Sequence, residues 1–331
     1  MGFVTPGFPS PMNRLRRSLA ASLALLATGS FAQNAPMPPL IKLIVPFAAG
    51  ASTDVTARAL AAQIGPKLGT NIIVENRAGA SGMIGAQAVV KGPKDGSQLL
   101  FTSVSMVTTA ATTRNSPFDV TKDLVPVAIL YDAPLIIAVS SKTEIRTPAD
   151  LLAAARAKPD QITHGTGGVG TFAHLAAELL NDAAKIQLKH IPYKGASLAV
   201  TDAVAGHVDA ILAVNSTFSP QIRGGRMRPI AVTSLQPSPA FPGVPTMASA
   251  VPGYNVTLWT AVFAPAGTPA AVVQRINREI NEAMKAKELQ EILQNDGGTA
   301  LALTPEESAR RVREAYATWK RVATNRNIVL E

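Results

Sequence analysis

Two glycine-rich segments carry the residue types that could bind a small anion. The first, residues 47–54, reads Phe-Ala-Ala-Gly-Ala-Ser-Thr-Asp, and the second, residues 165–171, reads Gly-Thr-Gly-Gly-Val-Gly-Thr. Each is expected to join a strand to a helix, where the first backbone N–H groups lack partners and carry a partial positive charge. Glycine lets a ligand approach the backbone, and Ser or Thr hydroxyls add donors. Both segments are therefore candidate anion sites.

Two further polar residues follow strands in the same way. Ser105 comes after the strand expected at residues 98–102, and Asn215 comes after the strand expected at residues 208–214. Ligands of open α/β folds bind beyond the carboxyl ends of strands, although each residue is equally explained as an ordinary polar loop residue. The expected ligand-binding residues are Phe47, Ala48, Ala49, Gly50, Ser52, Thr53, Asp54, Ser105, Gly165, Thr166, Gly167, Gly168, Thr171 and Asn215.

Several of these residues have a simpler explanation as helix caps. Ser52, Thr53 and Thr171 stand where a hydroxyl often caps its own helix. Asp54 competes with an anion for the same helix dipole, so it either caps the helix or balances an ammonium or hydroxyl group on the ligand. Two such segments in successive βα units favour ligand binding. A bulky apolar replacement of Ser52 or Thr166 is expected to weaken binding without impairing folding, since both are placed in loops.

Catalytic and cofactor motifs are poorly represented. The four histidines are too far apart for H-E-x-x-H, no carboxylate spacing completes a local metal site, and no G-x-S-x-G occurs. Residues 165–170 match G-x-G-x-x-G, but the next expected strand, residues 188–192, ends without the acidic residue that a dinucleotide site needs. His174 is expected to pack within its helix, with a pocket-lining role as the alternative. We therefore expect no catalytic residue, metal or cofactor.

The elements that position these segments alternate between strand and helix. Apolar runs at residues 40–46, 71–75 and 98–102 enclose alanine-rich stretches at residues 53–68 and 83–91, which predicts parallel βαβ units. Gly65-Pro66 is expected to kink or end the first helix early, because proline removes a helical hydrogen bond.

A second βα series follows a long apolar segment. Residues 125–140 are too long for one strand and are broken at Pro134, which indicates a crossing between two domains. Residues 256–264 supply a second crossing after a proline-rich stretch, and the remaining tail predicts amphipathic helices, with Ile276 and Ile280 on one apolar stripe. The expected domains are residues 36–134 with 255–331, and residues 135–254.

The N-terminus has the features of a secretory signal peptide. Three arginines precede the apolar run at residues 19–27, and small residues flank a cleavage point after Ala32. The run is too short for a membrane span, and a short buried helix is the other alternative. Met12 is a possible true start. We therefore expect residues 1–32 to be removed and the mature protein to be periplasmic.

The charge and the amino-acid composition exclude several classes of binding partner and of site. Removing residues 1–32 takes away three arginines and no acidic residue, so the formal charge falls from +9 to +6. The remaining basic residues are scattered singly, which argues against nucleic acid and leaves a weak field that attracts small anions. The chain has no cysteine, which excludes disulfides, zinc-cysteine sites, thiol nucleophiles and lipid attachment.

Several motifs together resemble the receptors of tripartite tricarboxylate transporters, often called the Bug family. They are IVPFAAGASTDVTAR at residues 44–58, VENRAGASGMIGA at residues 74–86, KDG at 94–96, HIPYKGA at 190–196, GHVD at 206–209 and PAGTP at 265–269. Such proteins are similar to type II periplasmic binding proteins, in which two α/β domains joined by two crossover strands close on a small ligand. In this family the two glycine-rich segments correspond to the ligand-binding loops.

The resemblance implies a monomeric periplasmic receptor that captures a small carboxylate and delivers it to a membrane permease. The family usually has glycine where Ala51 stands, proline where Ala78 stands and often asparagine where Met83 stands, so the first loop and the pocket wall could differ. Two alternatives are an exported hydrolase or isomerase acting on a small acid, and a ligand-sensing partner of a membrane sensor kinase. The absence of catalytic motifs favours the receptor.

Overall fold

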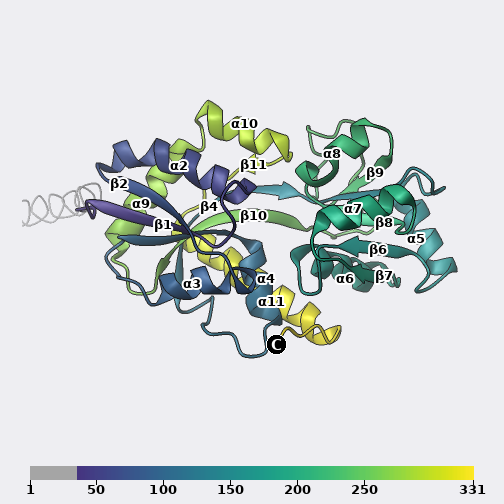
Figure 1. The fold of residues 1–331 in the computed structure, drawn as a ribbon, viewed down its shortest axis with the longest axis horizontal. Helices are drawn as coiled ribbons and strands as arrows, with labels where there is room; N and C mark the ends of the chain where they lie inside the picture. Colours follow the sequence, from purple (N-terminus) through teal and green to yellow (C-terminus); the bar gives the residue numbers. More distant parts are fainter. Residues whose placement is uncertain (1–35) are drawn as a thin grey trace, which may run out of the picture.

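A computed structural model describes residues 36–331 as two α/β domains joined by two crossover segments (Figure 1). The expected signal peptide at residues 1–32 and the alternative start at Met12 lie outside the described residues. Among residues 36–331, no helix is both long enough and apolar enough to cross a membrane.

The first domain contains a six-stranded sheet in the order β11-β4-β10-β3-β1-β2. Strand β1 lies between β2 and β3 and is parallel to both, and β10 runs antiparallel to both β3 and β4. This pairing confirms the βαβ units predicted for the first hundred residues. The strands are β1 (Leu40–Val45), β2 (Asn71–Asn76), β3 (Gln98–Ser103), β4 (Leu124–Pro134), β10 (Thr257–Pro265) and β11 (Thr299–Ala300).

Helices cover both faces of this sheet and bury separate apolar clusters (Figure 1). One cluster contains side chains of α2 (Ser52–Leu68), α9 (Ala270–Ala283) and α10 (Lys287–Asn295), including the fully buried Ile276 and Ile280. The other face packs on α3 (Met83–Val90), α4 (Val104–Thr112) and α11 (Pro305–Asn325). The tail helices therefore pack on the first domain as predicted.

The second domain contains a five-stranded sheet in the order β7-β6-β8-β5-β9. Helices α5 and α6 pack into one apolar cluster and α7 and α8 into another. Its elements are β5 (Ile136–Ser140), α5 (Pro148–Ala157), β6 (Thr163–Thr166), α6 (Phe172–Ala184), β7 (Lys189–Pro192), α7 (Ala196–Ala205), β8 (Ala210–Ala213), α8 (Asn215–Arg223) and β9 (Met227–Val232).

Local signals start the regular helices. Thr147 and Thr304 begin α5 and α11 with reciprocal capping boxes, each followed by proline at the first helical turn. The early end predicted for α2 is wrong, because α2 runs through Pro66 to Leu68. Gly69 then adopts a left-handed φ of 67° and donates its amide to the carbonyl of Pro66, which satisfies the helix end despite the proline.

The two crossovers are tied together by one buried hydroxyl. Only Leu135 separates β4 from β5, as the break at Pro134 predicted, while residues 233–256 connect β9 to β10. The hydroxyl of Thr233 accepts from the amide of Leu135 (2.8 Å) and lies 2.6 Å from the carbonyl oxygen of Val256, to which it donates. Thr233 therefore links both connections between the domains.

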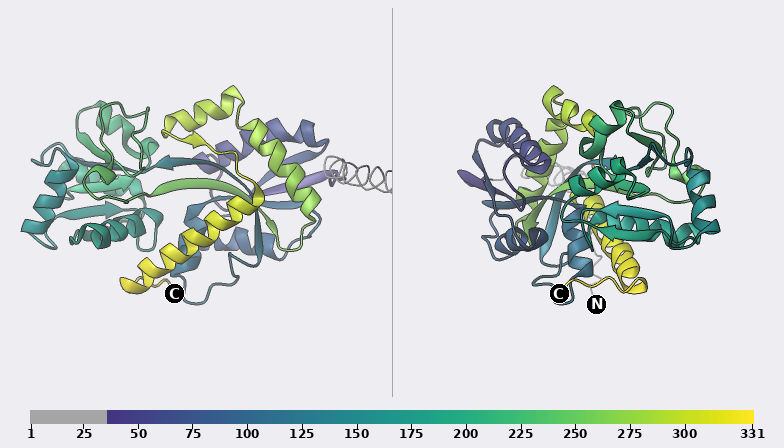
Figure 2. Two further views of the ribbon diagram at one scale, coloured as in Figure 1. Left: turned by 180° about the vertical axis from the view of Figure 1, so that it is seen from behind. Right: turned by 45° about the vertical axis from the view of Figure 1, so that its right-hand side comes forward.

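Helix α11 reaches beyond its own domain (Figure 2). The ring of Trp319 packs edge-on against that of Phe172, at the start of α6, with centroids 5.4 Å apart. Beyond the helix end, Arg326 pairs with Asp182 (2.6 Å) and with Glu178 (3.3 Å), both on α6. The C-terminal segment of the first domain is thus fastened to the second.

Candidate functional site

The directions of the strands place the candidate segments at one gap, which lies between the two domains. Because β10 is antiparallel to β3 and β4, strands β1 to β4 run the same way, and their carboxyl ends point to where β4 continues into β5. Strands β3 and β4 end at about the same height in the sheet. Thr260 of β10 pairs both with Ser103, the last residue of β3, and with Tyr131, near the end of β4. The segments after β1 and β3 therefore face the second domain.

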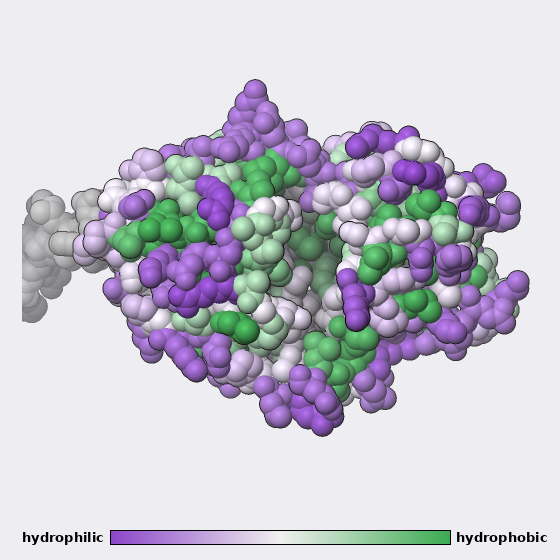
Figure 3. Space-filling model, in the orientation of Figure 1, coloured by the Kyte–Doolittle hydropathy of each residue, from purple (hydrophilic) through white to green (hydrophobic). Residues whose placement is uncertain are grey.

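The second domain presents its strand ends in the opposite direction. Strand β8 is antiparallel to β5 and parallel to β6, which is parallel to β7. Ile136, the first residue of β5, pairs with Ala213, the last of β8. The segments after β6 and β8 therefore face back toward the first domain. Figure 3 shows the surface hollowed between the two domains.

The first candidate segment presents exposed backbone at the start of α2. Ala48, Ala49 and Gly50 are exposed, whereas Phe47 is half-buried against the core. Gly50 has a φ of 82°, a conformation that other residues rarely adopt. The N-cap of α2 is Ala51, which has no side chain to cap the helix, so the exposed Ser52 and its neighbour Thr53 are not the capping residues. The first amides of α2 remain available to an anion.

Asp54 does not cap α2 with its side chain, and a contact with a group on the ligand stays a prediction. Its carboxylate is buried and accepts from the amide of Gly50 (2.9 Å), from Nε of Arg58 (3.0 Å) and from Nδ2 of Asn76 (2.9 Å). The hydrogen bond from Arg58, helped by those from Gly50 and Asn76, lowers the pKa of Asp54 to about 2. Asp54 is therefore an ionised group that holds the first segment in shape.

The second candidate segment is more buried than its sequence predicts. Thr166 is the last residue of β6 and only 1% exposed, so the expectation that it lies in a loop, where a bulky replacement would leave folding intact, is wrong. Its hydroxyl lies 3.1 Å from the carbonyl of Gly168, 3.2 Å from the amide of Gly168 and 2.6 Å from Nε2 of His190. The buried side chain of Thr166 therefore contacts the backbone of the second segment at Gly168.

The remaining residues of this segment pack against the start of α7. Gly165 is buried, and Gly167 and Gly168 are half-buried. A Cβ on Gly167 would lie 3.2 Å from the amide nitrogen of Ala196, so a side chain there would crowd the backbone of α7. Thr171 is the N-cap of α6 and accepts from the amide of His174 (3.4 Å), as the capping explanation predicts.

Ser105 and Asn215 lie in helices, which the sequence did not predict. Ser105 is in the first turn of α4, and its amide donates to Oγ of Ser103 (3.3 Å). Asn215 is the first residue of α8, and its Nδ2 donates to the carbonyl of Asn295 in the first domain (2.8 Å). Asn215 is thus engaged in a contact between domains.

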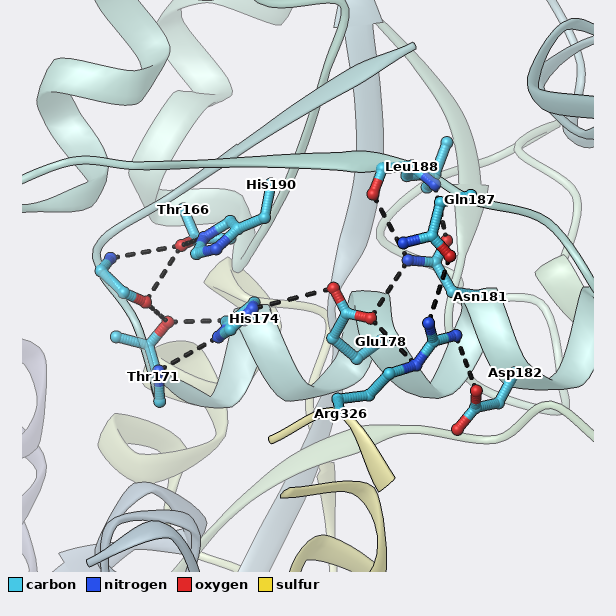
Figure 4. Close-up of polar contacts among 12 residues, drawn as sticks. Thr166, Thr171, His174, Glu178, Asn181, Asp182, Gln187, Leu188, His190 and Arg326 are labelled. Carbon is cyan, nitrogen blue, oxygen red and sulfur yellow. Dashed lines mark hydrogen bonds and ion pairs between the residues drawn. The ribbon is translucent and has the colours of Figure 1, made fainter. Parts of the chain in front are cut away.

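A cluster of three histidines, which the sequence did not predict, lies beneath the second segment; Figure 4 shows two of them, His174 and His190. The ring of His174 stacks on that of His190 with centroids 3.7 Å apart, and the ring of His164 stacks on that of His190 at 5.0 Å. His174 is buried inside α6, as expected, and the amide of Gly170 donates to its Nδ1 (3.1 Å). A signal existed: His164 and His190 are each next to a strand end, and they are direct partners across β6 and β7.

A second missed segment follows β2 at the same edge as the first candidate segment. Residues 79–82 all have positive φ, including the exposed Ala80 (46°) and Ser81 (53°). Such backbone is uncommon outside glycine and marks a shaped turn. The run Ala-Gly-Ala-Ser-Gly at residues 78–82 was the available signal. Met83, one of the departures from the family pattern, is buried in the core at the start of α3, so it does not line the gap.

A separate cavity of about 670 Å³ lies against the crossovers and α11 and contains none of the predicted site residues. Side chains of both domains line it, among them Asp132, Leu179, Trp259, Arg311 and Trp319. The Arg311 guanidinium is already paired with Asp132 (2.5 Å). Among residues 36–331, no group of three or more His, Asp or Glu side chains is placed to hold a metal ion.

Proteins similar to this chain include a named relative and two solved structures with bound carboxylates. The chain is 36% identical over 282 residues to Protein BugT of Bordetella pertussis, covering 84% of this chain and 86% of that protein. Rpa4515 of R. palustris, solved with adipate, has a TM-score of 0.75 and 29% identity over 88% of this chain and 98% of its own. MatC of Rhodopseudomonas palustris, solved with bound malate, has a TM-score of 0.70 and 27% identity over 86% and 98%.

The fold, the facing strand ends and these similarities agree with the match of residues 56–328 to the tripartite tricarboxylate transporter family receptor. The family and the structural neighbours are solute-binding receptors and not enzymes, and the two-domain type II architecture predicted from the sequence is confirmed. The chain belongs to the tripartite tricarboxylate transporter family of receptors.

Proposed function

We propose that this protein is a periplasmic receptor that captures a small carboxylate between its two domains and delivers it to a tripartite tricarboxylate transporter-type permease. The domains are residues 36–134 with 255–331, and residues 135–254. The supporting observation is that the segments after β1, β3, β6 and β8 all face one gap. A ligand in that gap touches both domains and so favours their closure.

The donors in these segments suit a carboxylate. Neither glycine-rich segment contains lysine or arginine, so the ligand is held by backbone amides and hydroxyls. The uncapped start of α2 supplies amides at the positive end of a helix dipole. The related proteins that were solved with adipate and malate support a carboxylate as the ligand class.

The crossovers provide the hinge for closure. Two connections of very different length, Leu135 alone and residues 233–256, join the domains and are linked by Thr233. Rotation about this point brings the first and second segments together. The closed form then differs in shape from the open one, and the permease recognises that difference.

The test is calorimetry on the processed protein with dicarboxylates, tricarboxylates, amino acids and aromatic acids. We expect one acid class to bind and to be recovered unchanged. Ser52→Leu places a bulky side chain at the exposed first turn of α2 and should weaken binding at least tenfold. Ala183→Leu is the matched control, because Ala183 is exposed at the far end of α6 and should leave affinity unaltered.

Three results would contradict the proposal. They are an absence of binding across the panel, chemical turnover of the bound acid, and equal affinities of Ser52→Leu and the unsubstituted protein. Delivery has its own test, which is ligand-dependent co-purification with the permease subunits from membranes. Capture of a sensor-kinase ectodomain in place of the permease would favour the sensory alternative.

A further inference from the structure

The histidine cluster is aimed at the backbone of the second segment. His174 comes from α6 and His190 from β7, and each places one ring nitrogen on residues 166–170 (Figure 4). His164 lies behind them, fully buried, with neither ring nitrogen hydrogen-bonded. The stacked rings therefore form the floor under a segment that the proposed function uses for ligand binding.

The bond to His174 fixes where that ring carries its proton. The amide of Gly170 donates to Nδ1, and a ring nitrogen accepts only when it has no proton. The single proton of the neutral ring is therefore on Nε2, which faces Oε1 of Glu178 at 3.7 Å. A proton added to Nδ1 would leave the Gly170 amide without its acceptor.

Gly170 is the point at which the segment turns into α6. Its φ is 75°, and a Cβ there would lie 2.9 Å from Cδ1 of Leu330. The left-handed φ favours glycine here, and the turn is held by its hydrogen bonds and by the side chain of Leu330 packed on it. The acceptor on His174 is one of those bonds.

The contact between Thr166 and His190 involves a second ring proton. The hydroxyl of Thr166 has one proton and two acceptors within reach: the carbonyl of Gly168 (3.1 Å), which also accepts from the hydroxyl of Thr171 (2.8 Å), and Nε2 of His190 (2.6 Å). When the proton goes to the Gly168 carbonyl, the oxygen of Thr166 accepts from the Gly168 amide (3.2 Å) and from His190 Nε2. In that arrangement His190, like His174, carries its proton on Nε2.

We propose that His174 and His190 are positioning residues for the second ligand-binding segment, holding the amides of Gly168 and Gly170 in place only while both rings are neutral and protonated on Nε2. This inference rests on the proposed function. The rings touch the segment and act on the ligand through it.

The charged groups around the rings maintain this state. On α6, Glu178 faces His174, and Arg326 and Asp182 complete the ion-pair network behind it. Arg326 offsets the charge of Glu178, which would otherwise draw a second proton onto His174. Burial, followed by the neighbouring His190, lowers the pKa of His174 to about 3, and burial lowers the pKa of His190 to about 4.

Matched substitutions separate positioning from packing. Asparagine places an amide oxygen the same number of bonds from Cα as Nδ1, so His174→Asn keeps an acceptor for Gly170, whereas His174→Leu removes it. Glutamine places an amide nitrogen where Nε2 lies, so His190→Gln keeps a donor for Thr166, whereas His190→Leu removes it. All four variants lose the ring stacking.

Calorimetry should give dissociation constants for His174→Asn and His190→Gln within about threefold of the unsubstituted protein, for the carboxylate identified by the panel. The two leucine variants should bind at least about tenfold more weakly, the effect of losing one hydrogen bond of about 1.4 kcal/mol. Equal affinities within each Asn–Leu or Gln–Leu pair would overturn the proposal.

A second measurement needs no ligand. Long-range ¹H–¹⁵N spectra at pH 7 should show protonated Nε2 and unprotonated Nδ1 on His174 and His190, and the Gly170 amide resonance should move in His174→Leu more than in His174→Asn. A proton on Nδ1 of His174, or equal shifts, would contradict the positioning role. If no carboxylate binds, the proposed function fails, and these spectra still decide whether the histidines hold the segment.

Discussion

Asp296 of the first domain caps a helix of the second: its Oδ1 accepts a hydrogen bond from the amide of Ser216 (2.9 Å) in the first turn of α8. The N-cap of α8 is Val214, whose side chain makes no capping hydrogen bond. A carboxylate from 80 residues further along the chain thus satisfies a helix end that faces the gap between domains.

Replacing Asp296 tests the strength of this cap. Asp296→Ala should lower the free energy of unfolding by about 1 kcal/mol, the usual effect of losing a capping oxygen. Asp296→Asn keeps an oxygen acceptor and should lose less. Urea denaturation measures both, and equal stability of Asp296→Ala and the unsubstituted protein would show that the contact contributes nothing.

Thr233 is expected to be a sensitive position at the crossovers. Thr233→Val keeps the shape but leaves the amide of Leu135 without its hydroxyl partner in a fully buried place. Leaving one buried polar group without a hydrogen-bond partner lowers the free energy of unfolding by about 1–3 kcal/mol. Thr233→Ser retains the hydroxyl and is the control. Denaturation of the two variants in parallel should separate them by at least about 1 kcal/mol, and similar stabilities would argue against the link.

Replacing Arg326 should lower the free energy of unfolding, because the buried carboxylate of Glu178 loses its cationic partner. Glu178 has a side chain only 9% exposed, and its pKa is raised chiefly by burial, so Arg326→Ala leaves it poorly compensated. We expect a loss of about 3 kcal/mol. Glu178→Gln combined with Arg326→Ala should recover part of it, and a double-mutant cycle measures the coupling. Additive losses would mean that the pair does not interact.

Acidification should destabilise the protein through its histidines. The pKa of His174 is lowered to about 3 and that of His190 to about 4, so between these values and 6.5 the unfolded chain binds protons that the folded protein does not. Stability therefore falls as pH decreases from about 6.5. Each histidine should contribute roughly 1–2 kcal/mol between pH 7 and pH 5.

A double variant without these two histidines isolates their contribution to the pH dependence of stability. The double variant His174→Asn with His190→Gln should lose less stability than the unsubstituted protein over the same pH interval, by urea denaturation at each pH. Glu178, whose raised pKa acts in the opposite direction, is present in both proteins and cancels in the comparison. Parallel losses in the two proteins would contradict the depressed histidine pKa values.

Ala51 offers a prediction in which stability and binding change in opposite directions. Its backbone (φ −66°, ψ 158°) is that of an ordinary N-cap, so Ala51→Ser can supply the missing cap of α2 and add about 1 kcal/mol of stability. The added hydroxyl occupies amides that the proposed ligand needs, so affinity should fall. Ala51→Gly carries no hydroxyl and serves as the control. Unchanged affinity in Ala51→Ser would place the ligand elsewhere.

Much of this fold could be predicted from the sequence because its strands are buried apolar runs separated by capped or alanine-rich helices. Strands β1, β2 and β3 differ from their predicted bounds by one residue at an end. The crossing at Pro134 was visible because an apolar run of sixteen residues is too long for one strand.

Helix α4 was missed because its residues argue locally for a strand. Five of the nine residues of Val-Ser-Met-Val-Thr-Thr-Ala-Ala-Thr are β-branched, and such residues have low helix propensity. All except Ser105 are buried, so packing against β3 and α11 determines the helix. The same miss placed Ser105 in a loop.

The sequence predicted that each candidate segment joins a strand to a helix, as the structure has it, but it did not predict the contacts within them. The role of Asp54 depends on Asn76, 22 residues away, and that of Asn215 on a carbonyl 80 residues away. The histidine floor depends on the register that pairs His164 with His190. Such contacts are set by strand order and register, which a single sequence does not specify.

Both tryptophans of the chain line the cavity beside the crossovers, and both are buried. Trp259 lies on β10, which enters from the second domain, and Trp319 touches Phe172 across the domain boundary. Tryptophan fluorescence, excited selectively at wavelengths too long for tyrosine to absorb, therefore comes from the place where the domains meet. Opening and closing can be followed in the native, unlabelled protein, in real time, by the light that two side chains emit.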